Sequence, residues 1–320
     1  MTQFHQLITR DPQTSTAQMI ADLVPPREFA EATLENYRPD DRFPSQKDAQ
    51  NFCLNLPVKA GSKSNASIYL DGGFGVGKTH LMVGLYKRFK GSKAFGSFLA
   101  FTSLIGALGF AAALQELAKF DLICIDEFEL DDPGNTMIMS RLLNELSAKG
   151  VRFAATSNTP PNALGEGRFA AADFRREILG IGEKFTFMRI DGEDFRHRPT
   201  QAHSSALSMD ALGEWLLQDQ AQASIDDFPR LLAKLSDLHP AKYSHLLDGI
   251  ERIGLTNVQE ISHEFDALRF VAFVDRAYEA GVQMKSTGIG LTNVFAKSYF
   301  SGSYQKKYQR AVSRLGSMSL

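Results

Sequence analysis

The sequence has few cysteines and no long apolar run, and each absence excludes a class of protein. Cys53 and Cys124 are the only cysteines among 320 residues, and their separation matches no zinc-ligand spacing. We therefore predict free thiols in a reducing compartment, not a disulfide framework. No apolar stretch approaches the roughly 18 residues that span a bilayer, and the N-terminal residues lack the apolar segment of a signal peptide. We expect a cytoplasmic protein without a transmembrane segment.

The chain also lacks an excess of charge of either sign. It has 35 Lys and Arg residues against 37 Asp and Glu residues, a net charge of −2 at pH 7, and a pI near 6.4. This balance argues against a nucleic-acid-binding protein or one that docks on anionic membranes. With 43% hydrophobic residues, a chain of this length can build two domains, each with its own core.

One stretch matches the phosphate-binding pattern G-x-x-x-x-G-K-[S/T] at every fixed position. It reads Gly72, Gly73, Phe74, Gly75, Val76, Gly77, Lys78 and Thr79, followed by His80. A short apolar run precedes it, and apolar residues at helical spacing follow, as a strand–loop–helix unit requires. The glycines let backbone N–H groups converge on one anion at the helix N-terminus. We therefore predict that ATP binds here, that Lys78 reaches its phosphates and that Thr79 ligates Mg²⁺.

A second signal is the apolar run 122–125, which ends in Asp126 and Glu127. This pattern is typical of a buried parallel strand, and the carboxyl end of such a strand faces the ligand crevice of a doubly wound sheet. We predict that Asp126 completes the Mg²⁺ site beside Thr79 (the Walker B role) and that Glu127 acts as the base for an attacking water. Asn158, after another buried strand, is predicted to sense the γ-phosphate.

Strands and helices alternate along the chain, which predicts an α/β fold of the P-loop NTPase type, with a five-stranded parallel sheet flanked by helices. We predict strands at 68–70, 98–101, 122–125, 151–158 and 185–190, and a helix at 104–117 that Gly106 and Gly109 weaken. The predicted domains are an N-terminal extension (1–28), an ATPase domain (29–200) and a smaller, mostly helical or α/β C-terminal region (201–320). The pentapeptide Gly-Leu-Thr-Asn-Val, at 254–258 and 290–294, hints at an added α/β unit.

The approach to the first strand is rich in aromatic residues and proline. It includes Tyr37, Pro39, Phe43 and Gln46. Such a segment either wraps the base of a bound nucleotide, with Tyr37 and Gln46 in contact with it, or simply packs on the sheet. The residues alone favour neither reading.

Several of these motifs together resemble one protein family. They are Gly72–Thr79, Ile125–Phe128, Ala155–Asn158 with Pro160 and Pro161, Tyr37–Pro39 with Phe43–Gln46, Asp194–Arg198, Arg269–Tyr278 and Ser313–Leu315. The combination resembles the ZapE family, which includes the mitochondrial AFG-one-like ATPases and forms a compact branch of the AAA+ proteins. The resemblance implies ATP hydrolysis and a homo-oligomer assembled with nucleotide. For bacterial members it also implies recruitment to the division septum and action on the tubulin-like division protein.

The chain departs from that family where an arginine finger is expected. The family usually carries Arg-x-Arg-Phe in the segment after its sensor strand, and here residues 171–174 read Ala-Ala-Asp-Phe. Arg168 and Arg176 are therefore the finger candidates. Near the C-terminus, Arg310 and Arg314 either include a sensor arginine or cap a surface helix, and we favour the surface helix.

Two other functions fit the same core motifs. One is a helicase-loader-like ATPase that acts on nucleic acid, which the acidic pI makes less favourable. The other is a nucleotide-gated scaffold, in which ATP orders an interface and hydrolysis is incidental.

Overall fold

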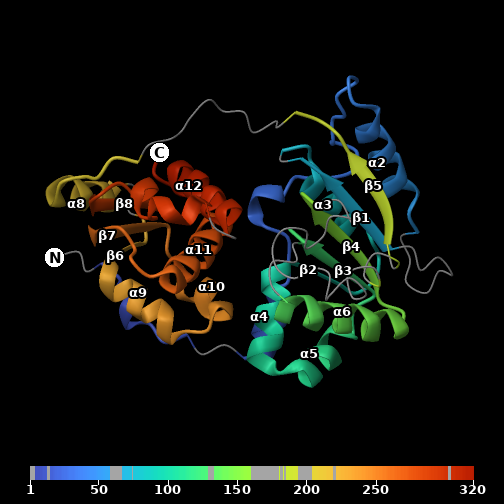
Figure 1. Ribbon diagram of the computed structural model, residues 1–320, viewed down its shortest axis with the longest axis horizontal. Coiled ribbons are helices and arrows are strands. Elements are labelled where there is room, and N and C mark those ends of the chain that lie inside the picture. Colours follow the sequence, from blue (N-terminus) through green and yellow to red (C-terminus); the bar gives the residue numbers. More distant parts are fainter. Residues whose placement is uncertain are drawn as a thin grey trace. The chain divides into compact units, whose positions relative to one another are not determined.

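The computed structural model describes residues 4–12, 15–57, 67–73, 75–128, 133–159, 180, 183, 185–193, 204–218, 221–301 and 304–320. The chain divides into two compact units (Figure 1). The P-loop unit consists of residues 16–25 and 29–198, and the C-terminal unit of residues 1–15, 26–28 and 199–320. Among the described residues, no helix has both the length and the apolar character needed to cross a membrane.

The P-loop unit contains a five-stranded sheet in the order β2-β3-β4-β1-β5. All neighbouring strands are parallel, so the predicted fold class is confirmed. The strands are β1 (Ser67–Gly72), β2 (Lys93–Ser97), β3 (Leu122–Asp126), β4 (Arg152–Ser157) and β5 (Phe185–Ile190). Because β4 lies between β1 and β3, polar residues at its carboxyl end can reach the ends of both neighbours.

Helices cover both faces of this sheet (Figure 1). They are α1 (Thr16–Ala21), α2 (Pro44–Asn55), α3 (Lys78–Arg88), α4 (Phe98–Leu108), α5 (Phe110–Leu117) and α6 (Pro133–Ala148). Alternate strand residues point to opposite layers, as the two-residue period of a strand dictates. Ile68 and Leu70 pack with α2 and α3, whereas Tyr69 packs with α4, α5 and α6. The resulting three layers bury the strands and set the positions of their carboxyl ends.

The strand predicted at 98–101 is wrong. Residues 98–101 form the first turn of α4, and the strand β2 lies just before them. The Ser97 hydroxyl accepts a 3.2 Å hydrogen bond from the backbone N–H of Ala100, an N-cap that starts the helix at Phe98. The helix predicted at 104–117 is also divided, because Gly109 has a φ of 79° and separates α4 from α5.

The C-terminal unit contains a second parallel sheet, with three strands in the order β6-β7-β8. Its strands are β6 (Ala223–Asp227), β7 (Arg252–Val258) and β8 (Gln283–Gly288), and its helices are α8 (Met209–Leu217), α9 (Phe228–Asp237), α10 (Tyr243–Leu246), α11 (Glu264–Glu279) and α12 (Gln305–Met318). On one face, α9, α11 and α12 enclose the main core. On the other face, α8 packs through Leu212, Trp215 and Leu216.

The described residues at the N-terminus belong to this same unit. His5 pairs in parallel with Ser224 on β6, and Leu7 is fully buried in the core. Arg10 donates hydrogen bonds of 2.9 and 2.7 Å to the carbonyls of Leu246 and Asp248. These residues therefore belong to the C-terminal unit, although they precede the P-loop unit in sequence.

Candidate nucleotide site

The loop between β1 and α3 has the backbone shape that a phosphate cradle needs. Gly75 and Gly77 have φ values of 69° and 89°, which glycine adopts at no steric cost. Gly72 leaves no room for a side chain, since a Cβ there would lie 2.2 Å from the carbonyl oxygen of Ile190. Gly77 provides no side-chain cap for α3, so the first-turn N–H groups of that helix are available to an anion. Phe74 lies outside the described residues.

Lys78 and Asn158 are brought together at the end of β1. The Nζ of Lys78 donates hydrogen bonds to the Oδ1 of Asn158 at 2.9 Å and to the carbonyl of Gly72 at 3.0 Å. Lys78 is only 9% exposed, and α3 places it at its first position. A buried ammonium beside a polar amide is suited to an anionic ligand, because its charge is poorly screened by water.

Thr79 and Asp126 also meet, as the sequence predicts for a Mg²⁺ site. The Oγ1 of Thr79 lies 3.1 Å from Oδ1 and 3.3 Å from Oδ2 of Asp126. Burial, together with the neighbouring charge of Glu127, raises the pKa of Asp126 to about 6, while hydrogen bonds from Thr156 and Thr79 act in the opposite direction. A divalent cation would favour the ionised carboxylate in this place.

Glu127 follows directly and adopts a left-handed backbone conformation, with a φ of 52°. For a residue other than glycine this conformation costs roughly 1–2 kcal/mol. Such strain persists only where the surrounding structure enforces it, and it clusters at functional sites. The surrounding structure therefore holds Glu127 in this conformation, at the place where the sequence predicts the catalytic base.

The approach segment contacts the loop directly. The hydroxyl of Tyr37 donates a 2.9 Å hydrogen bond to the carbonyl of Val76, and burial raises the pKa of Tyr37 to about 12. The ring packs against Gly77, where a Cβ would come within 2.4 Å of a ring carbon. His80 is directed at the same segment, since its Nε2 lies 2.9 Å from both the carbonyl of Thr33 and the Oδ1 of Asn36.

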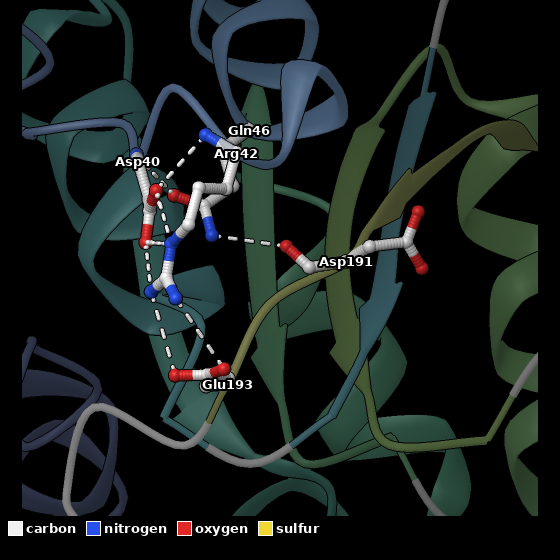
Figure 2. Close-up of polar contacts among 5 residues, drawn as sticks. All are labelled: Asp40, Arg42, Gln46, Asp191 and Glu193. Atoms are coloured by element: carbon white, nitrogen blue, oxygen red, sulfur yellow. Dashed lines mark hydrogen bonds and ion pairs between the residues drawn. The ribbon is translucent and has the colours of Figure 1, made fainter.

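Figure 2 shows how the approach segment is fastened to the residues after β5. The Arg42 guanidinium lies 2.7 Å from the carboxylate of Asp40 and 3.4 Å from that of Glu193. Gln46 accepts a hydrogen bond from the backbone of Asp40 and donates one to the carbonyl of Asp191, both at 2.9 Å. The segment thus packs on the loop and the sheet, and contact of Tyr37, Gln46 or His80 with a nucleotide stays a prediction.

The arginine predictions meet two different outcomes. Arg168 and Arg176 lie outside the described residues, so their role as finger candidates stays a prediction. The surface reading of Arg310 and Arg314 is wrong. The two side chains are only 26% and 17% exposed, and their guanidinium groups form ion pairs with the buried carboxylate of Asp275.

The described residues fit ATP and Mg²⁺ by the chemistry of their donors. They contain no cluster of three or more His, Cys, Asp or Glu side chains that would hold a metal ion alone. Mg²⁺ normally binds through one or two protein oxygens and takes its other ligands from substrate phosphates and water. Thr79 and Asp126 supply such a pair, while Lys78 and the first turn of α3 supply positive charge for the phosphates. Sequence reasoning assigned no role to Thr156, whose hydroxyl hydrogen-bonds to Asp126.

Comparisons with known proteins agree with this chemistry. The family described as AFG1-like ATPase matches residues 13–218 and 209–320. The chain is 32% identical over 174 residues to "Cell division protein ZapE" of Escherichia coli strain K12, a match that covers 50% of this chain and 44% of that protein. It is also 36% identical over 90 residues to "Lactation elevated protein 1 homolog B" of Danio rerio, covering 28% of this chain and 18% of that protein. The matched segments therefore span less than half the length of these relatives.

Solved structures show a more distant likeness. The crystal structure of DnaI matches with a TM-score of 0.44 and 20% sequence identity, and the match covers 55% of this chain and 98% of DnaI. DnaA of Aquifex aeolicus bound to AMPPCP matches with a TM-score of 0.39 and 20% identity, over 50% of each chain.

Proposed function

The chain belongs to the AFG1-like ATPase family, and from this premise we propose that it hydrolyses ATP with Mg²⁺ at the site between β1, β3 and β4. One observation carries the proposal. A hydroxyl and a carboxylate from α3 and β3 meet at 3.1 Å, while an ammonium from α3 and an amide from the end of β4 meet at 2.9 Å. Phosphoryl transfer needs mainly positioning and charge neutralisation, and this set supplies both.

Each side chain then has a definite role. Lys78 and the N-terminus of α3 neutralise the phosphate oxygens. Thr79 and Asp126 are the protein ligands of Mg²⁺, which when bound supplies positive charge at the phosphates. Glu127 orients the attacking water and accepts its proton. Asn158 contacts the γ-phosphate from the end of β4 and, through Lys78, joins this contact to the loop.

The test is phosphate release by the purified chain, with Mg²⁺ and with excess EDTA. We expect turnover only with Mg²⁺. Glu127→Gln should keep ATP affinity but lower kcat by about a hundredfold or more, since general-base catalysis contributes at least this much. Glu214→Gln, which changes an exposed carboxylate of α8, is the matched control and should behave as wild type. Wild-type turnover by Glu127→Gln would refute the assignment of the base.

We further propose that this ATPase acts in cell division on the tubulin-like division protein, which implies recruitment from the cytoplasm to the septum. The likeness to the Escherichia coli protein named for cell division supports a role in that process, and the family resemblance of the motifs suggests the partner. Cosedimentation with polymers of the purified division tubulin, with and without a non-hydrolysable ATP analogue, tests it. We expect nucleotide-dependent cosedimentation that Lys78→Ala abolishes. Equal recovery in the supernatant under all conditions would exclude this partner.

A further inference from the structure

The hydroxyl of Thr156 lies between two residues of the acidic turn. Its Oγ1 accepts a 3.1 Å hydrogen bond from the backbone N–H of Glu127 and forms a second hydrogen bond with the Oδ1 of Asp126. Thr156 is on β4 and only 2% exposed, so water does not compete for either bond. A single buried oxygen thus contacts both acidic residues.

The direction of these two bonds follows from their partners. A backbone N–H can only donate, so the Thr156 oxygen must accept from Glu127. The single hydroxyl proton is then free to go to Asp126, whose ionised carboxylate can only accept. The two hydrogen bonds therefore fix the orientation of the hydroxyl, which accepts from the backbone of Glu127 and donates to the carboxylate of Asp126.

The backbone of the same residue continues this support. The carbonyl of Thr156 accepts a 2.7 Å hydrogen bond from the N–H of Phe128. Thr156 thus holds three consecutive residues, 126, 127 and 128, and the middle one has the left-handed φ of 52°. A left-handed non-glycine residue needs such support to persist.

We propose that Thr156 is a positioning residue, which fixes the metal-binding carboxylate of Asp126 and the base Glu127 relative to each other through one hydroxyl. This proposal rests on the proposed function. Groups that orient metal ligands typically change metal affinity or activity by about tenfold to a hundredfold when they are removed. Thr156 acts through Asp126 and Glu127 and needs no contact with substrate.

The C-terminal unit offers a matched control. There, Asn257 also has a left-handed φ, of 55°, and its backbone N–H donates a 3.2 Å hydrogen bond to the hydroxyl of Thr287 on β8. Thr287→Val removes the same kind of bond from a residue with the same left-handed φ, here within β7 and in a unit without the P-loop. It therefore reports the general cost of losing such a bond.

The experiment compares Thr156→Val, Thr156→Ser and Thr287→Val in the full chain. One readout is the steady-state kcat and KM for ATP. The other is the affinity for a non-hydrolysable ATP analogue with Mg²⁺ and with EDTA. Valine keeps the shape without the hydroxyl, and serine keeps the hydroxyl. For Thr156→Val we expect kcat to fall by about tenfold to a hundredfold. KM should rise by about tenfold, because in a slowed variant it follows the weakened Mg²⁺-dependent binding.

The binding readout separates this proposal from the proposed function. With Mg²⁺, the affinity of Thr156→Val for the ATP analogue should be about tenfold below that of wild type. In EDTA, the two affinities should be equal. Thr156→Ser should restore kcat, KM and the Mg²⁺-dependent affinity, and Thr287→Val should match wild type. Wild-type values for Thr156→Val, equal losses in Thr156→Ser, or equal losses in Thr287→Val would each overturn the proposal. If instead Glu127→Gln hydrolyses ATP normally, the proposed base is wrong, and the Mg²⁺-dependent affinity still decides the role of Thr156.

Discussion

The ammonium of Lys78 lies 2.9 Å from the amide oxygen of Asn158, which joins the phosphate loop to the end of the neighbouring strand β4. The two residues are far apart in sequence, and only the strand order places them together. Because β4 also contacts the end of β3 through Thr156, this central strand links the loop to the acidic turn. Asn158 is therefore connected to the phosphate loop through Lys78, which is consistent with its proposed contact with the γ-phosphate.

The first prediction concerns the charge of Lys78. Lys78→Ala should weaken ATP binding by about tenfold to a hundredfold, since a charged hydrogen bond contributes about 1.5–3 kcal/mol. Isothermal titration with a non-hydrolysable ATP analogue measures it. Lys90→Ala, an exposed lysine after the same helix, is the control and should bind as wild type. Unchanged affinity in Lys78→Ala would mean that the loop does not hold the phosphates.

The second prediction concerns the packing of Tyr37 on the loop. Gly77 and Gly150 both have a positive φ, but a Cβ at Gly77 would meet the Tyr37 ring at 2.4 Å, whereas nothing lies within 4 Å of one at Gly150. Gly150→Ala should cost about 1 kcal/mol from backbone strain alone. Gly77→Ala should cost at least about 1 kcal/mol more, as an overpacked site does.

Urea unfolding followed by far-UV circular dichroism measures both glycine variants. The only tryptophan of the chain is Trp215, which belongs to the C-terminal unit. Trp215 fluorescence therefore follows unfolding of the C-terminal unit. A transition that circular dichroism detects and Trp215 fluorescence does not is the unfolding of the P-loop unit. Equal losses of stability in the two variants would contradict the prediction, because they would show that the Tyr37 ring moves away from the added methyl group without cost.

Sequence reasoning predicted the five-stranded sheet because four of its strands, all except β2, have the required local signals. The buried strands β1, β3 and β4 contain short apolar runs, and glycine, acidic or other polar residues mark their carboxyl ends. The contact of Thr79 with Asp126 follows once these strands are parallel neighbours in one sheet. The sequence pattern was therefore sufficient to predict the strands and this contact, because the same segments carry both the apolar run and the polar groups of the site.

Sequence reasoning failed where the same local sequence is compatible with more than one structure. The apolar residues 98–101 suit a strand, but the cap at Ser97 begins a helix there. The pentapeptide Gly-Leu-Thr-Asn-Val is part of strand β7 at 254–258, whereas at 290–294 it contains a 3₁₀ helix. The hydrogen bonds of Thr156 depend on the register of β3 with β4, which no single segment encodes. The cap at Ser97 is local, whereas tertiary contacts decide the other two cases.

The third prediction concerns assembly. We expect Glu127→Gln with ATP to form a larger homo-oligomer than the same variant without nucleotide, because slow hydrolysis keeps ATP at the site. Size-exclusion chromatography with light scattering measures the mass. Lys78→Ala is the control and should keep one mass under both conditions. A single mass for every variant, with and without ATP, would contradict nucleotide-driven assembly.

The same variants distinguish an ATPase from a nucleotide-gated scaffold. If ATP alone orders the interface, binding of the division tubulin should need ATP and survive Glu127→Gln at full extent. If turnover is required, Glu127→Gln should bind the partner but fail to release it. Stimulation of turnover by single-stranded DNA, lost at high salt, would instead favour a nucleic-acid function.

The last prediction concerns Asp275, whose buried carboxylate on α11 binds Arg310 and Arg314 of α12. Burial raises the pKa of Asp275, but the two arginines outweigh it and hold that pKa below its usual range. A folded pKa below the unfolded value stabilises the fold above the unfolded pKa. That stability is lost as the pH falls through the folded pKa.

Asp275→Asn should therefore lower the free energy of unfolding at pH 7 by about 3–5 kcal/mol, because it leaves two half-buried cations without their carboxylate. The difference from wild type should shrink below about pH 4, where the carboxylate in the unfolded chain is protonated. Asp266→Asn, which breaks a more exposed 3.6 Å ion pair with Arg269, should cost less than about 1 kcal/mol. Trp215 fluorescence during urea unfolding follows this unit directly. A pH-independent difference between Asp275→Asn and wild type would show that packing, and not the ion pairs, joins α11 to α12.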